Sequence, residues 1–289
     1  MNVLLQILFS GCAIGMIYAV VAFGYQLTFA TSETLNFGHG EALAVGALVG
    51  FSVVGHVNYW LMIPAVLIFG ALFGVVVERV AVQPALKRKS EGWIMATIAL
   101  GIIVRNVAEN IWGKENVKFP SPVPEVPLQF GGANVLPMEI VVVVGALAMM
   151  LAIEVFNRRS IFGKAVVATA VDRGAASLMG INTGLVITFS YALSCATAAF
   201  AGVLVAPLTL AGAGMGASLG LKAFAVAIIG GLTSGVGAVV GGIIIGVAET
   251  ATGYYISTGY KDVPGLVLLL VVLAVKPAGL FGKTIVKKV

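Results

Sequence analysis

Long apolar runs, separated by short polar segments, divide almost the whole sequence. A helix needs about 20 apolar residues to cross the ~30 Å hydrocarbon core of a membrane. The sequence also has 60% hydrophobic and 10% charged residues, whereas soluble domains carry about 25% charged residues. It therefore predicts an all-α, polytopic transmembrane helix bundle that forms a single domain over residues 1–289. The predicted spans are 4–30, 35–55, 59–82, 93–112, 137–156, 183–211, 235–258 and 263–281.

A ninth apolar run, residues 219–233, is shorter than the others. As a helix it would reach about 22 Å, less than the thickness of the hydrocarbon core. It is either a short helix that crosses inside the protein or a re-entrant segment. The sequence thus predicts eight or nine crossings.

Glycines recur four residues apart within the predicted spans. Small residues at this spacing let helix backbones approach closely in lipid, so we expect tight helix packing at these positions. The pairs are Gly11/Gly15, Gly46/Gly50, Gly70/Gly74, Gly237/Gly241 and Gly242/Gly246.

Most basic residues lie in three segments: 83–92, 157–182 and the C-terminal tail. Lys and Arg accumulate in cytoplasmic loops, so we expect all three segments in the cytoplasm. Three spans precede residues 83–92, which places the N-terminus and the 113–136 loop outside. The tail returns to the cytoplasm only if 219–233 crosses, which favours nine passes. These segments contain Lys87, Arg88, Lys89, Arg158, Arg159, Lys164, Arg173, Lys276, Lys283, Lys287 and Lys288.

The formal net charge of +5 does not indicate nucleic-acid binding, because the basic residues lie between spans. The two histidines are on different segments and the two cysteines lie in apolar runs, so we expect no metal site. GLFGKT near the C-terminus lacks the first glycine of a phosphate-binding loop, since Pro277 occupies that position. We expect no catalytic site in this chain.

The external loop 113–136 contains PSPVPEVP, which predicts a stiff, extended spacer. It is either a contact platform for an extracytoplasmic partner or a plain connection.

Polar side chains near the start of the second span form the first candidate site. Asn36, His39 and Glu41 lie around two glycines in NFGHGE. They could line a pathway at a broken helix, or they could be the start of a helix with cap residues at the interface.

Other ionisable residues lie within the spans, where an uncompensated charge is costly. Glu249 is a further candidate for lining the pathway, and Lys222 either faces the bundle interior or snorkels to the interface. Arg105 and Glu109 are four apart on one helix and are expected to form a structural ion pair.

The 157–182 loop contains a short helix-compatible run that ends in GAASLMG. A polar, glycine-bounded helix between two spans has the form of a docking element for a soluble partner. An ordinary cytoplasmic loop held inside by its charges is the alternative interpretation.

Four stretches together resemble the permeases of Liv-type ABC importers for branched-chain amino acids. They are 17–41, 162–182, 221–249 and 277–282, and their order and spacing match across nearly the whole chain. The resemblance implies a permease in a bacterial inner membrane that pairs with a sister permease, as a heterodimer or homodimer. It also implies two cytoplasmic ATPase subunits that hold ATP and Mg, a periplasmic substrate-binding protein, and no cofactor in this chain.

The resemblance gives the 157–182 loop a role as a coupling loop with a coupling helix. Permeases of these importers carry an EAA-x-x-x-G motif that docks on the ATPase, and Ala175, Ala176 and Gly180 match it. Gly174 stands where the motif has Glu, so Asp172 or Arg173 would take the polar role. Gly163 and Lys164 complete the coupling surface implied by the resemblance.

The leading hypothesis is a permease subunit of an ATP-driven importer for branched-chain or other hydrophobic amino acids. Related importers for urea, amides or aromatic acids are the alternative within this class. A secondary transporter or channel that uses Glu33, His39, Glu41 or Glu249 as ion sites is the alternative from another class.

Overall fold

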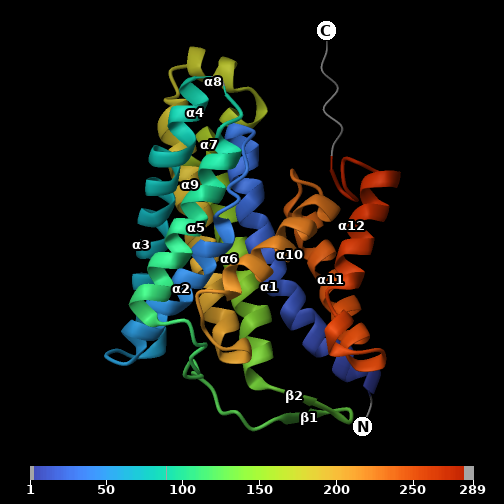
Figure 1. Ribbon diagram of the computed structural model, residues 1–289. Helices are drawn as coiled ribbons and strands as arrows, with labels where there is room; N and C mark the ends of the chain where they lie inside the picture. The colour runs from blue at the N-terminus through green and yellow to red at the C-terminus, as the bar shows by residue number, and fades with distance from the viewer. Residues whose placement is uncertain (1–2, 89, 283–289) are drawn as a thin grey trace.

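The computed structural model describes residues 3–88 and 90–282, and these residues are largely helical (Figure 1). Lys89, Lys283, Lys287 and Lys288 therefore lie outside the described residues. The first half contains α1 (Val3–Ser32), α2 (His39–Val54), α3 (Tyr59–Val77), the π-helical turn η1 (Glu78–Val82), α4 (Gln83–Lys87), α5 (Trp93–Trp112), β1 (Leu128–Phe130) and β2 (Ala133–Val135). The second half contains α6 (Pro137–Arg159), α7 (Ile161–Val171), α8 (Arg173–Leu178), α9 (Thr183–Thr209), α10 (Met215–Gly230), α11 (Gly235–Tyr255), the 3₁₀ turn η2 (Thr258–Tyr260) and α12 (Val263–Val275).

The predicted all-α polytopic bundle is confirmed. Among the described residues, 7 helices are long and apolar enough to cross a membrane, and they correspond to seven of the eight full-length predicted spans. The prediction of a full-length span at 35–55 was wrong in extent, since residues 33–38 are not helical and α2 has 16 residues. The run 219–233 belongs to α10, which also has 16 residues, so each of these two helices reaches about 24 Å.

The two short helices meet inside the bundle. Gly40, near the start of α2, packs directly against the backbone of Gly216 and Gly220 on α10. Because a short helix in lipid would leave its end groups without partners, this enclosure accounts for helices that are too short to cross by themselves.

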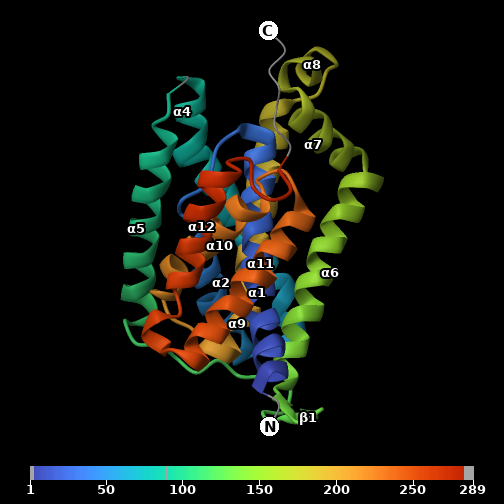
Figure 2. The same ribbon diagram turned by 90° about the vertical axis from the view of Figure 1, so that its right-hand side faces the viewer.

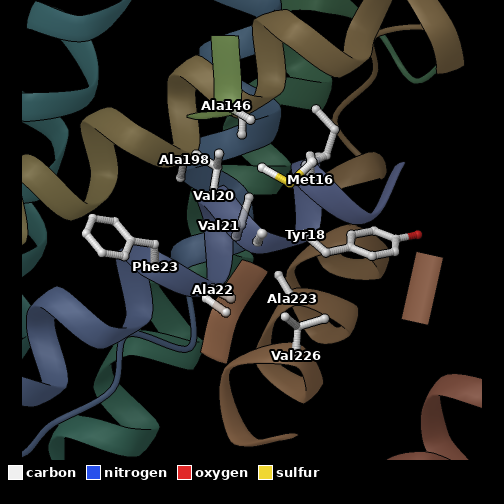
Figure 3. Packing of buried hydrophobic residues seen from close by; sticks show 14 of the residues in the cluster. Met16, Tyr18, Val20, Val21, Ala22, Phe23, Ala146, Ala198, Ala223 and Val226 are labelled. Atoms are coloured by element: carbon white, nitrogen blue, oxygen red, sulfur yellow. The ribbon is translucent and has the colours of Figure 1, made fainter. Parts of the chain in front are cut away.

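Helix α1 lies at the centre of the structure and contacts α6, α9, α10 and α11. Small side chains fill these contacts, among them Ala146, Ala198 and Ala223, which surround the middle of α1 (Figure 3). Figure 2 shows α5 and α6 on opposite flanks, with α11 and α12 between them in this view. Their exposed apolar side chains fit contact with lipid or with another membrane subunit.

The glycine spacing predicted helix contacts correctly on α2 and α3. Gly70 and Gly74 on α3 face the backbone of α9 at Ala196 and Tyr191, and Gly46 on α2 faces Ala199 of the same helix. A Cβ at any of these glycines would collide with that backbone, so α9 can lie close to both helices only because the side chains are absent.

The predicted loops lie at opposite ends of the bundle. Helices α4, α7 and α8 project at one end, and the β1–β2 hairpin lies at the other end beside the start of α1 (Figure 1). The hairpin is attached to α1, because the backbone N–H of Asn134 donates to the Oε1 of Gln6 at 2.8 Å. The 113–136 loop is thus more than an extended spacer, since its last part forms an antiparallel pair of strands.

The predicted span 263–281 ends earlier, at Val275, because Pro277 cannot continue a helix. The chain then turns back onto the α10–α11 connection. The N–H groups of Leu280 and Phe281 donate to the carbonyls of Ile229 and Gly230, at 2.8 and 3.2 Å. Residues 276–282 therefore hold the ends of α10 and α12 together.

Candidate functional site

The projecting pair α7–α8 is built by two side-chain caps. The Ser160 Oγ accepts from the N–H of Gly163 at 2.8 Å and starts α7. The Asp172 Oδ1 accepts from the N–H of Ala175 at 2.9 Å and starts α8. Asp172 therefore has a polar role at the start of α8, as a cap that satisfies a free backbone donor.

The two glycines of this predicted coupling surface have structural roles. A Cβ at Gly163 would collide with the backbone of Phe156 and Asn157, so this glycine lets α7 fold against the end of α6. Gly180 has a φ of +84°, which a glycine adopts without strain, and it turns the chain out of α8.

The remaining predicted coupling residues differ in exposure. Lys164, Arg173 and Ala175 are exposed, whereas Ala176 is buried within the chain. Ala176 thus packs this loop against its neighbours, and the exposed residues form the surface that a partner could contact.

Sequence reasoning missed the apolar part of this surface. Leu178 and Met179 are 91% and 84% exposed at the projecting tip, and Ile161 and Val171 are also strongly exposed. The signal was visible as large apolar residues inside a basic loop. Exposed apolar side chains that lie together are a candidate protein contact.

The predicted pathway residues do not form one site. Asn36 and His39 are buried in the bundle: Asn36 accepts from the N–H of Gly38 at 3.1 Å, and the ring of His39 lies 4.6 Å from that of Tyr25. The Nδ1 of His39 is also 3.4 Å from the Oγ of Ser194. These contacts fit residues that hold the broken start of α2 in place.

Glu41 lines a cavity to which Asn36 and His39 do not contribute. This cavity, of about 260 Å³, lies between α2, α5 and α10, and its floor includes Gly40, Gly101, Gly216 and Gly220. Among the described residues the Glu41 Oε2 has no hydrogen-bond partner. Glu41 and Glu249 therefore lie in separate cavities.

Glu249 belongs to a charged and polar cluster with Tyr18, Lys222 and Asp262. The Lys222 Nζ lies 3.1 Å from the Glu249 Oε2 and 2.7 Å from the Asp262 Oδ1. The hydroxyl of Tyr18 donates to the same Glu249 oxygen at 2.8 Å. The side chain of Lys222 is 16% exposed, so it faces the interior and does not snorkel to the interface.

Sequence reasoning noted Lys222 and Glu249 but missed Tyr18 and Asp262. In Figure 3 the side chain of Tyr18 extends from α1 away from the labelled alanines, and its hydroxyl is the atom farthest from them. Nothing local in the sequence indicates this contact, because α1, α10, α11 and the start of α12 each supply one member.

The cluster lines a cavity of about 680 Å³. This volume falls within the range of roughly 300–1,000 Å³ typical of small-molecule sites. Its walls come from α1, the end of α9, α10, α11 and the turn before α12. The predicted pair of Arg105 and Glu109 is also present, at 3.0 Å, but on α5 and outside this cavity.

A helix bundle with these spans, a cavity between its helices and a projecting two-helix loop has the architecture of a polytopic membrane protein. The family described as "branched-chain amino acid transport system / permease component" matches residues 7–275. The chain belongs to this family.

Relatives and a solved structure agree with this family. The high-affinity branched-chain amino acid transport system permease protein LivH of Escherichia coli is 34% identical, over 99% of this chain and 97% of the relative. BraD of Pseudomonas aeruginosa, a permease protein with the same description, is 31% identical over 99% of this chain and 98% of its own. The structure of PsaBC from Streptococcus pneumoniae in complex with Fab has a TM-score of 0.51, with 14% identity over 96% of this chain and 93% of that chain, and shows a shared fold.

These findings confirm the predicted class, a permease subunit of an ABC importer and not an enzyme. The resemblance seen in the sequence is likewise confirmed.

Proposed function

We propose that this permease imports branched-chain or other hydrophobic amino acids in an ATP-driven complex. The observation that carries the proposal is the match over residues 7–275 to a branched-chain amino acid permease family, together with relatives of that description along nearly the full chain. The substrate itself is inferred from those relatives.

Permeases of this class work with ATPase subunits and a substrate-binding protein. We assign ATP and Mg to two cytoplasmic ATPase subunits, and substrate delivery to a periplasmic binding protein. A sister permease would complete the pathway, with the exposed apolar faces of this bundle providing contact area for it and for lipid. The proposed location is the inner membrane, with the N-terminus outside and the C-terminus in the cytoplasm.

The proposed coupling element is α7–α8. It projects at the end that the basic residues assign to the cytoplasm, and it carries exposed Leu178, Met179, Lys164 and Arg173. Helix α7 contacts α1, α6 and α9. Movement of a docked ATPase would therefore reach the central helix α1 directly, and through it the helices that line the 680 Å³ cavity.

The test of this function is uptake of labelled leucine by cells with and without this chain. Deletion should abolish high-affinity uptake, and unlabelled valine and isoleucine should compete in the complemented strain. Urea and aromatic acids serve as competitors for the alternative substrates. Unchanged leucine uptake on deletion would refute the substrate assignment.

The energy source separates an importer from a secondary transporter. Depleting ATP should stop uptake while the proton gradient is maintained, and collapsing the gradient at constant ATP should leave uptake intact. The reverse result would favour ion coupling through Glu41 or Glu249.

A further inference from the structure

The charged cluster around Lys222 is not explained by coupling, since none of its residues lies in α7–α8 and all of them line the 680 Å³ cavity. A purely structural ion pair requires one cation and one anion. This cluster has one cation and two carboxylates, Glu249 and Asp262, and all of them border the cavity.

The hydrogen bonds of Lys222 are complete. An ammonium group has three donors, and they reach the Tyr18 hydroxyl at 3.3 Å, the Glu249 Oε2 at 3.1 Å and the Asp262 Oδ1 at 2.7 Å. Two of these partners are buried on transmembrane helices. The third, Asp262, is 56% exposed at the edge of the cavity.

Within residues 3–88 and 90–282, Lys222 is the one ion-pair partner of Asp262. Asp262 occupies the cap position before α12, yet its side chain makes no capping hydrogen bond. Its carboxylate instead forms an ion pair with the Lys222 ammonium. An exposed carboxylate on a turn can be exchanged for another carboxylate at low cost, because water solvates it once it leaves.

Glu249 can accept a further hydrogen bond. Its Oε2 accepts from Tyr18 and Lys222, but its Oε1 is buried and has no hydrogen-bond partner within the described part of the chain. A buried carboxylate oxygen without a donor is costly. A ligand that brought a positively charged donor would relieve this cost.

A small apolar pocket adjoins these polar groups. It has a volume of about 170 Å³ and is lined by Leu221, Ala225, Ile245, Gly265 and Leu266, together with Lys222, Glu249 and Asp262. A Cβ placed on Gly265 would lie 3.6 Å from the Glu249 Oε1, so this oxygen faces the pocket. One cation, one unpartnered carboxylate oxygen and one apolar pocket therefore converge.

We infer that this cluster is a binding site for a neutral α-amino acid within the permease. This inference rests on the proposed function and names residues that contact the substrate. The substrate carboxylate displaces Asp262 from the Lys222 ammonium, the substrate ammonium donates to the Glu249 Oε1, and the branched side chain occupies the pocket beside Gly265. Asp262 thus stands in for the substrate carboxylate while the site is vacant.

The test uses the assembled importer, purified through a tag on this chain and embedded in nanodiscs without nucleotide or binding protein. Equilibrium binding of labelled leucine is measured against two competitors that keep the side chain but lack one charge, leucinamide and 4-methylpentanoate. Unlabelled leucine should compete at least about tenfold better than either, because each analogue loses one charged hydrogen bond. Equal competition by either analogue would overturn the inference.

Three variants distinguish a binding site from a structural clamp, meaning a cluster that only stabilises the fold. Lys222→Gln should weaken leucine binding about tenfold or more, whereas Asp262→Asn should strengthen it several-fold because the competing carboxylate is gone. Gly265→Ala fits the fold, since its Cβ would be 3.4 Å from Ile245, and should weaken leucine binding more than alanine binding. A clamp predicts that Asp262→Asn lowers the melting temperature and leaves leucine affinity unchanged or lower, and that result would refute the site.

Lys118→Gln is the matched control, because Lys118 forms an exposed 3.0 Å ion pair with Glu125 and does not line this cavity. It should bind leucine like the wild type. If Lys222→Gln does not assemble, Asp262→Asn and Gly265→Ala decide the question. Wild-type importer that transports leucine while all three variants bind it normally would refute the site alone. Absence of both leucine uptake and leucine binding in the wild type would refute the proposed function as well.

Discussion

Gly15 on α1 and Gly242 on α11 face each other backbone to backbone. A Cβ on either glycine would collide with the carbonyl group of the other. One turn away, a Cβ on Gly246 would collide with the carbonyl oxygen of Gly11, and a Cβ on Gly11 with the Cα of Val247. Two G-x-x-x-G motifs thus cross, which lets the helix axes approach more closely than larger residues would permit. The crossing also fixes the site, because Tyr18 and Glu249 follow these glycines on the same two helices and meet at 2.8 Å.

The first prediction concerns this crossing. Gly242→Ala should destabilise the folded permease by about 1–3 kcal/mol, since the added methyl group has no space beside Gly15. Thermal unfolding in detergent, followed by size-exclusion chromatography, measures the effect. Gly253→Ala is the control on the same helix, because a Cβ there meets nothing within 4 Å. Equal melting temperatures for the two variants would contradict the close crossing.

The second prediction concerns the Tyr18 hydroxyl. Tyr18→Phe keeps the ring but removes the donor to Glu249 and one acceptor of Lys222. We expect a loss of about 1 kcal/mol in stability and weaker leucine binding in the nanodisc assay. Tyr254→Phe, at an exposed position on α11, should change neither quantity. Stability and affinity that match the wild type in Tyr18→Phe would show that the hydroxyl does not orient the cluster.

The third prediction concerns the C-terminal turn. Gly279 has a φ of +82° and packs against the Ile228 carbonyl and the backbone of Gly231. Gly279→Ala combines backbone strain with a collision, so we expect a loss of about 1–3 kcal/mol. Gly259→Ala is the control, because its Cβ would have its nearest neighbour at 3.7 Å. Differential scanning fluorimetry of the two variants tests this difference, and a stable Gly279→Ala would argue against a structural role for residues 276–282.

The helices were predictable from the sequence because crossing a membrane is a local requirement. A run of apolar residues must be long enough by itself, and the backbone must satisfy its own hydrogen bonds. The extent of α2 was not predictable in this way. Residues 33–38 are not helical, and the buried Asn36 supplies an acceptor for the N–H of Gly38.

The Lys222 cluster could not be predicted from the sequence, for a different reason. Glu249 and Lys222 were recognisable as costly groups within apolar runs. Their partners Tyr18 and Asp262 lie far away along the chain, and only the tertiary packing of four helices brings them together. The predicted coupling loop, residues 157–182, shows the converse. Its motif was readable in the sequence, but the burial of Ala176 and the exposure of Leu178 depend on how α8 packs.

The fourth prediction tests the difference in burial between Ala176 and Leu178 in the proposed coupling element. Leu178 is exposed within this chain, so Leu178→Asp should leave the stability of the permease within about 0.5 kcal/mol of the wild type, with little change in melting temperature. Burying a leucine in a partner contributes about 1.5–3 kcal/mol, so its replacement by a charge should weaken ATPase docking at least tenfold. Co-purification of the ATPase and leucine uptake should both fall, while Leu178→Met should preserve them. Ala176→Asp should instead lower the melting temperature, because that side chain is buried inside the permease. Normal uptake and normal ATPase recovery in Leu178→Asp would exclude α8 as the docking surface.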